Sequence, residues 1–311
     1  MKKLTSNSKL KVMKKYFLYI IVLLAFIYSG CDKPGPTELV DDETFDVEIL
    51  GKDIEDEFYS NGFDSSGVIE NRINFASVIS VGGIKLTKAN TTINISAAQT
   101  IIFDKTKPFR SPHGVLLGYN TIIPGSIKFD DVQARLTNYR VRFREAGLLI
   151  DTVLGRKYEL FHINGINSDE FIYPYNSSIT FIYSPFFGGQ QSSFEFLTPK
   201  EVTGNVKIVR ANNQNDFRIE LNWNGESVNN FSVIIGGVRT QNQQAFPFYR
   251  IKTKDDGNLI IPSSLLKNIP RDRFNKITIS FIRKYDKLVQ VQNNEVYVAS
   301  QSIHTIIVDI P

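Results

Sequence analysis

The stretch Phe217-Arg218-Ile219-Glu220-Leu221-Asn222-Trp223 decides the fold class, because apolar and polar residues alternate along its whole length. Successive side chains of a β-strand point to opposite faces, so a period of two is typical of a strand with one buried face. Residues 277–281, Ile-Thr-Ile-Ser-Phe, repeat the pattern. We therefore expect β-structure on both sides of this stretch.

Pairs of turn residues separate the apolar runs, and they supply the positive φ angles that tight hairpin turns need. The pairs are Gly82-Gly83, Gly188-Gly189, Asn224-Gly225, Gly236-Gly237 and Asp256-Gly257. Helical periodicity is almost absent, and its one candidate is residues 263–268, between Pro262 and Pro270. Many short strands with regular turns predict an all-β protein built of antiparallel β-sandwiches.

The best domain boundary is Thr198-Pro199-Lys200, where a Phe-rich strand ends before a new set of strands begins at Gly204. We predict tandem β-sandwich domains at residues 68–198 and 199–311. One larger sandwich of the jelly-roll type is the alternative, since the same periodicity allows it. Residues 255–266, DDGNLIIPSSLL, resemble a segment of the immunoglobulin-like domains found at the C-terminus of bacterial lipoproteins, and the resemblance implies that fold for the second domain.

The N-terminus has the layout of a secretory signal, with six lysines and no acid in its first fifteen residues before the apolar run Tyr16–Tyr28. Those 13 residues are fewer than the roughly 20 that a membrane-spanning helix needs. The run ends in Ser29-Gly30-Cys31, which resembles the lipobox of bacterial lipoproteins, with Tyr28 where that family usually has Leu. The resemblance implies that residues 1–30 are a cleaved signal peptide and that Cys31 carries a diacylglycerol and a further acyl chain such as palmitate.

Residues 31–67 are predicted to form an acidic, flexible tether. Between Asp32 and Glu57 there are eleven acidic residues against Lys33 and Lys52, and repulsion among like charges favours an extended chain. An acidic stretch after the lipidated cysteine resembles the surface-export signal of Bacteroidota lipoproteins, whereas Asp32 resembles the inner-membrane retention signal of enteric bacteria. We expect the outer membrane, at its periplasmic face or at the cell surface.

The charge argues against a nucleic-acid-binding protein, and the cysteine count argues against a fold held by disulfides. Removing the six lysines of the signal from the 36 basic residues leaves 30, against 32 acidic residues, so nothing favours nucleic acid as a partner. Cys31 is the only cysteine, so the exported body has no disulfides. We expect the membrane as a partner, through the lipid on Cys31, and an envelope protein or a glycan as a second one.

The sequence predicts no catalytic residue, no metal site and no cofactor. Its three histidines stand too far apart for zinc-ligand spacing, and adjacent acids on a strand point to opposite faces instead of converging on one bond. The turn Asp255-Asp256-Gly257-Asn258 lacks the Glu that completes a calcium loop. The histidines are His113, His162 and His304, and the adjacent acids are Asp130-Asp131, Asp169-Glu170 and Asp255-Asp256.

Two features are candidates for binding. Arg140, Arg142 and Arg144 alternate with apolar residues, so one strand face presents a row of guanidinium groups that suits sulfate, uronate or phosphate. A solvated face paired with acids is the alternative. Aromatic residues crowd the stretch 171–187, where Tyr173, Tyr175 and Tyr183 are the predicted contacts for a sugar or a protein. The alternative is that these rings fill the core.

The leading functional hypothesis is a non-catalytic binding or assembly module anchored in the membrane. A carbohydrate-active or other hydrolytic enzyme, whose acids converge only in the fold, is the alternative, and a structural envelope protein is the second. A pocket lined by two acids from different strands favours the enzyme. An exposed aromatic patch favours binding.

Overall fold

The structure is a computed structural model that describes residues 45–49, 75–110, 112–114, 116–145, 148–164, 169–210, 217–241, 245–267, 269–291 and 294–311. The predicted signal peptide, Cys31 and all of the predicted tether except residues 45–49 lie outside the described residues. The chain divides into two units, and every described residue belongs to the second, Asp42–Pro311. Within these ranges no helix combines the length and the apolar character needed to cross a membrane.

The all-β prediction is confirmed, since strands make up almost all of the regular structure. The strands are β1 (Phe45–Ile49), β2 (Ser77–Lys88), β3 (Thr91–Arg110), β4 (Leu116–Thr121), β5 (Gly125–Phe129), β6 (Val132–Gln133), β7 (Arg135–Glu145), β8 (Leu148–Ile163), β9 (Ser178–Pro185), β10 (Ser192–Leu197), β11 (Gly204–Arg210), β12 (Phe217–Trp223), β13 (Phe231–Arg239), β14 (Ala245–Thr253), β15 (Asn258–Ile261), β16 (Phe274–Val291) and β17 (Asn294–Asp309). The predicted helical turn between Pro262 and Pro270 is α2 (Ser263–Leu266).

One large sheet holds ten of these strands, in the order β1-β14-β13-β16-β17-β2-β3-β8-β7, with β4 on β3. Neighbouring strands are antiparallel except β2 and β17, which are parallel. A parallel pair needs a crossover connection, and here the connection consists of everything between β2 and β17. β2, near the start of the described residues, therefore lies beside β17, the last strand.

Two smaller sheets pack against the large sheet. The four-stranded sheet, β10-β9-β5-β6, packs on β2, β3, β8 and β17 around residues such as Ile79 and Phe181. The three-stranded sheet, β11-β12-β15, packs on β13, β14 and β16 around residues such as Ile219 and Phe281. We call these regions the four-stranded half and the three-stranded half. Face-to-face sheets with apolar cores between them make the sandwich-like fold that the sequence predicts.

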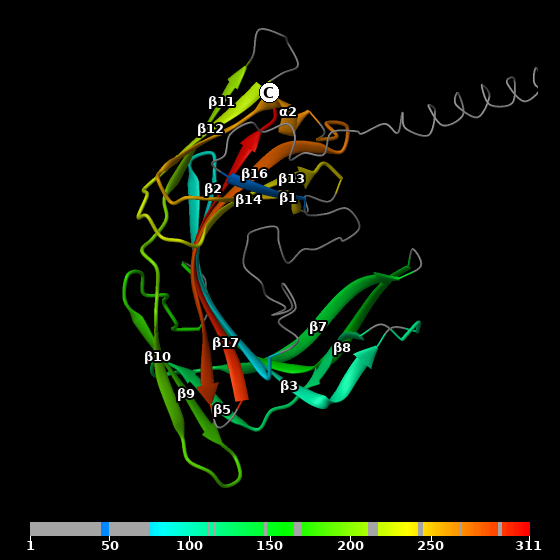
Figure 1. Cartoon of the computed structure of the whole chain (residues 1–311), viewed down its shortest axis with the longest axis vertical. Helices are drawn as coiled ribbons and strands as arrows, with labels where there is room; N and C mark the ends of the chain where they lie inside the picture. The colour runs from blue at the N-terminus through cyan, green and yellow to red at the C-terminus, as the bar shows by residue number, and fades with distance from the viewer. Residues whose placement is uncertain are drawn as a thin grey trace, which may run out of the picture. The chain divides into compact units, whose positions relative to one another are not determined.

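The large sheet is continuous across both halves. Figure 1 shows β16 and β17, in orange and red, running from the region of β11 and β12 to that of β9 and β10. On β17, Val298 packs in the four-stranded half and Val308 in the three-stranded half. The small sheets separate at Thr198-Pro199, because the four-stranded sheet ends at Leu197 and the three-stranded sheet begins at Gly204. The division into domains at 68–198 and 199–311 stays a prediction.

Local patterns agree with the predictions in part. β12 alternates buried and less buried residues along its length. On β16, Thr278 and Ser280 are buried as well as the alternating apolar residues of 277–281, so both faces of this part of the strand are covered. The hairpin turns predicted at Gly82-Gly83 and Gly236-Gly237 are wrong: both pairs lie inside strands, β2 and β13. A Cβ at Gly83 would overlap two tyrosine rings, so close packing explains this glycine.

Candidate functional site

The arginine row lies on β7, which ends the strand order of the large sheet. Arg140 is exposed and its neighbours Tyr139 and Val141 are buried, as the alternation predicts. Its Nε lies 3.3 Å from Oδ1 of Asp151 on β8. That contact agrees with a solvated face paired with an acid across the sheet. The side chains of Arg142 and Arg144 lie outside the described residues, so binding by the row stays a prediction.

The aromatic stretch divides into buried and exposed residues. Phe171 and Tyr173 are each 2% exposed and belong to the core of the four-stranded half. Oη of Tyr173 lies 2.7 Å from Oγ of Ser300, and the backbone N–H of Tyr173 donates to Oγ of Ser96 at 3.0 Å. Burial raises the pKa of the Tyr173 hydroxyl far above its ordinary value. Tyr173 is therefore a core residue whose hydroxyl already has a partner.

Tyr175 and Tyr183 are half-buried. Tyr175 packs edge-on against Tyr173, with ring centroids 5.0 Å apart. Burial raises the pKa of both hydroxyls, so both are neutral at physiological pH. Tyr183 lines a cavity between the large sheet and the four-stranded sheet.

The loop joining β9 and β10 carries two exposed phenylalanines. Phe186 is 56% exposed and Phe187 is 94% exposed. The next residues, Gly188 and Gly189, have φ angles of 56° and 99°, which a turn of this kind requires and most side chains disfavour. Figure 1 shows this loop at the free end of the β9 and β10 hairpin. We call residues 186–189 the hairpin tip.

The sequence contains a signal for the hairpin tip, although the predicted contacts were tyrosines and not these phenylalanines. Residues 186–189 read Phe-Phe-Gly-Gly. Paired glycines are typical of a hairpin turn, so these phenylalanines lie at the end of a hairpin. A single exposed apolar residue is normal in a folded protein, whereas adjacent exposed aromatic rings indicate a contact surface.

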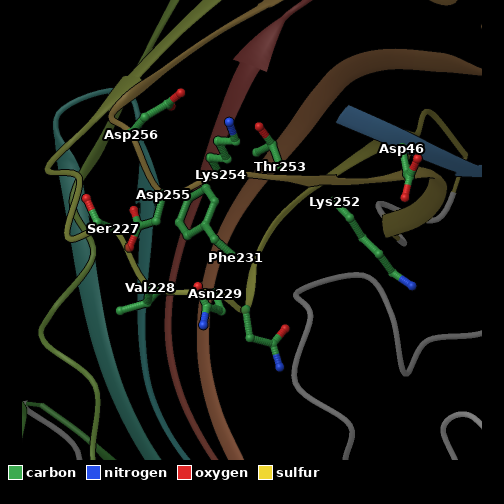
Figure 2. A pocket seen from close by; sticks show the side chains of 11 residues that line it. Asp46, Ser227, Val228, Asn229, Phe231, Lys252, Thr253, Lys254, Asp255 and Asp256 are labelled. Carbon is green, nitrogen blue, oxygen red and sulfur yellow. The ribbon is translucent and has the colours of Figure 1, made fainter. Parts of the chain in front are cut away.

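A polar pocket of about 570 Å³ is formed by residues of β1, of β14 and of the loops before β13 and after β14. Figure 2 shows Asp46 and Asp256 on opposite sides of it, with Lys252 and Lys254 between them. Its third acid, Asp255, is 1% exposed and bound to the Arg283 guanidinium, with Nε–Oδ2 and Nη2–Oδ1 distances of 2.7 and 3.0 Å. The pocket therefore holds acids from different strands without bringing their carboxylates together.

The Arg283 guanidinium is wholly buried and joins three segments of the chain. Besides Asp255, it donates to the carbonyl oxygens of Asn224 at 2.6 Å, Lys200 at 3.1 Å and Glu201 at 3.4 Å. Nε1 of Trp223 donates to the same carboxylate at 2.8 Å. The Asp255-Asp256-Gly257-Asn258 stretch thus connects β14 to β15, and its first acid has a structural role that the sequence did not predict.

His304 is 6% exposed and links β17 to the start of β11. The backbone N–H of Gly204 donates to its Nδ1 at 2.8 Å, and its Nε2 lies 3.0 Å from Oγ1 of Thr87. Burial, with a smaller contribution from Lys85, lowers the pKa of His304 to about 4. Among the residues that the structure describes, no group of three or more His, Cys, Asp and Glu could hold a metal ion.

The chain has no match among protein-family models or curated proteins. Among solved structures it is similar to the yeast delta-COP-I mu-homology domain, at 9% identity and a TM-score of 0.28, over 74% of this chain and 97% of that one. The same domain complexed with the Dsl1 WxWxV peptide matches at 10% identity and a TM-score of 0.28, over 74% of this chain and 98% of that one. Identity this low says nothing about function.

Proposed function

We propose that the protein is a non-catalytic binding module, held on the outer membrane by lipid on Cys31, and that the hairpin tip is its contact surface. The anchoring part rests on the signal layout and on Ser29-Gly30-Cys31. The binding part rests on one observation, the exposure of Phe186 and Phe187.

Contact with a partner would bury the two phenylalanine rings, and this burial supplies binding free energy. Burying a phenylalanine side chain contributes about 1.5–3 kcal/mol relative to leaving it in water. Phe187 obtains almost none of this in the folded chain, and Phe186 obtains less than half. Aromatic residues are also the side chains that most often dominate binding energy at interfaces. An apolar groove on an envelope protein is the kind of partner that suits such a tip.

The hydrolytic alternative receives no support from the polar pocket. Hydrolysis of a glycosidic bond needs two carboxylates on either side of it, about 5 to 9.5 Å apart. In the polar pocket one carboxylate belongs to the Arg283 ion pair, and the other two lie on opposite sides in Figure 2. The exposed aromatic pair makes binding the better-supported function.

The test is capture of partners from isolated envelopes by the lipidated wild type and by a Phe186→Ser/Phe187→Ser variant. Because neither ring belongs to a buried cluster, we expect the melting temperature to change little while the captured partner is lost. Ile260→Ser is the matched control, since Ile260 is also 56% exposed but lies on β15 in the other half. Equal capture by all three proteins would exclude the hairpin tip as the contact surface.

A further inference from the structure

An apolar cavity of about 240 Å³ lies in the four-stranded half, between the large sheet and the four-stranded sheet. Buried residues such as Ile79, Phe181 and Val296 form its base. Ile122 and Asn294, both exposed, belong to its rim. Since an apolar cavity of about 150 Å³ admits a benzene molecule, this one has room for a slightly larger molecule that enters from solvent.

Thr100 on β3 lines this cavity and is 1% exposed, yet its Oγ1 has no hydrogen-bond partner in the described part of the chain. Its side chain lies on the same face of β3 as the cavity residue Ile102, two positions along the strand. The opposite residue on β8, Tyr158, donates its own hydroxyl to the carbonyl oxygen of Gly125 at 2.5 Å. A buried hydroxyl without a partner is destabilising, so a ligand group that bonded to Oγ1 from the cavity would remove this cost.

We propose that this cavity binds a small neutral amphiphile, with an apolar body the size of one ring or a short alkyl chain and one hydroxyl or carbonyl that bonds to Oγ1 of Thr100. None of the described residues that line the cavity carries a charge. A charged ligand would lose its hydration without gaining a counter-ion, so a neutral one fits. The threonine hydroxyl both donates and accepts, which allows either polar group on the ligand.

The cavity opens next to the hairpin tip. Pro124 lines the cavity, and its carbonyl oxygen accepts a hydrogen bond from the backbone N–H of Phe186 at 3.0 Å. The binding site is nevertheless inferred from the lining of the cavity and from the hydroxyl of Thr100, which is unpartnered among the described residues. It does not rest on the proposed contact between the tip and a partner, and either can fail without the other.

The test uses a matched pair of probes, benzyl alcohol and toluene, which differ by one hydroxyl group. Residues 31–311 with Cys31→Ser, a chain that contains the whole unit Asp42–Pro311, are titrated with each probe while the methyl resonances of Ile79 and Val296 are followed. We expect both probes to cause saturable shifts. Thr100→Val should then reduce the preference for benzyl alcohol over toluene about fivefold, which corresponds to about 1 kcal/mol for one hydrogen bond.

Thr305→Val is the matched control, since Thr305 is 2% exposed and its Oγ1 lies 2.8 Å from Oγ of Ser280, outside the cavity. We expect it to lower the melting temperature and leave the probe preference unchanged, whereas Thr100→Val should raise the melting temperature by about 2–4 °C.

Ile102→Phe, which fills part of the cavity, should weaken the binding of both probes. If neither probe shifts the two methyl resonances, or if Thr100→Val keeps the wild-type preference, the proposal is overturned.

Discussion

Each half of the protein buries a polar side chain completely, and the surroundings of the two side chains differ. In the three-stranded half, each N–H group of the buried Arg283 guanidinium has an acceptor. In the four-stranded half, Thr100 is almost as deeply buried and its hydroxyl has none among the described residues. A fully paired network stabilises one arrangement, whereas an unpaired group beside a cavity leaves a place for a further molecule. We infer that the three-stranded half mainly supplies stability and that the four-stranded half supplies the binding surfaces.

The largest expected loss of stability is that of Arg283→Met, which tests the difference between the two halves. Removing the guanidinium leaves the Asp255 carboxylate buried and without its counter-charge, which typically costs about 3–5 kcal/mol. Urea unfolding of the wild type and the variant measures the loss. Arg218→Met is the matched control, because Arg218 forms an exposed ion pair with Glu220 at 2.7 Å, and exposed ion pairs contribute little to stability. Similar losses in the two variants would contradict a stabilising network.

The four-stranded half can be tested through its own aromatic residues. Tyr173→Ala removes a buried ring that packs in the core and should cost about 3–5 kcal/mol. Tyr183→Ala removes a half-buried ring at the cavity and should cost about 1 kcal/mol. Thermal unfolding of both variants under one set of conditions gives the comparison. A Tyr183→Ala variant as unstable as Tyr173→Ala would make Tyr183 a core residue rather than part of a binding surface.

The pH dependence of stability tests the contribution of His304. Its pKa in the folded protein is about 4, below the ordinary 6.5, so the folded state resists protonation and the unfolded state does not. Stability is therefore complete above about pH 6.5 and falls as the pH drops toward 4, by about 3 kcal/mol at most. Unfolding measured at pH 7 and pH 4.5, with His304→Gln as the control, isolates this contribution. The variant should lose less stability between the two pH values than the wild type.

Some of the candidate site could be predicted from the sequence and some could not. The alternation at Tyr139, Arg140 and Val141 correctly indicates which side chains face solvent, because strand geometry alone decides it. The aromatic stretch contains both core and surface residues at similar spacing, and which sheet covers which ring is decided by contacts far along the chain. Tyr173 packs in the core of the four-stranded half and its hydroxyl meets Ser300 of β17, a neighbour that no local pattern indicates.

The sequence by itself determined the class of fold, since alternating side chains and turn glycines act over a few residues. The predictions of export and of lipid on Cys31 also rest on the order of residues along the chain. Only the tertiary structure decided that β2 pairs with β17 and that Asp255 meets Arg283. Thr100 likewise lines a cavity only once two sheets have packed. These contacts join residues far apart in sequence, so burial and pairing arise from packing that no short pattern encodes.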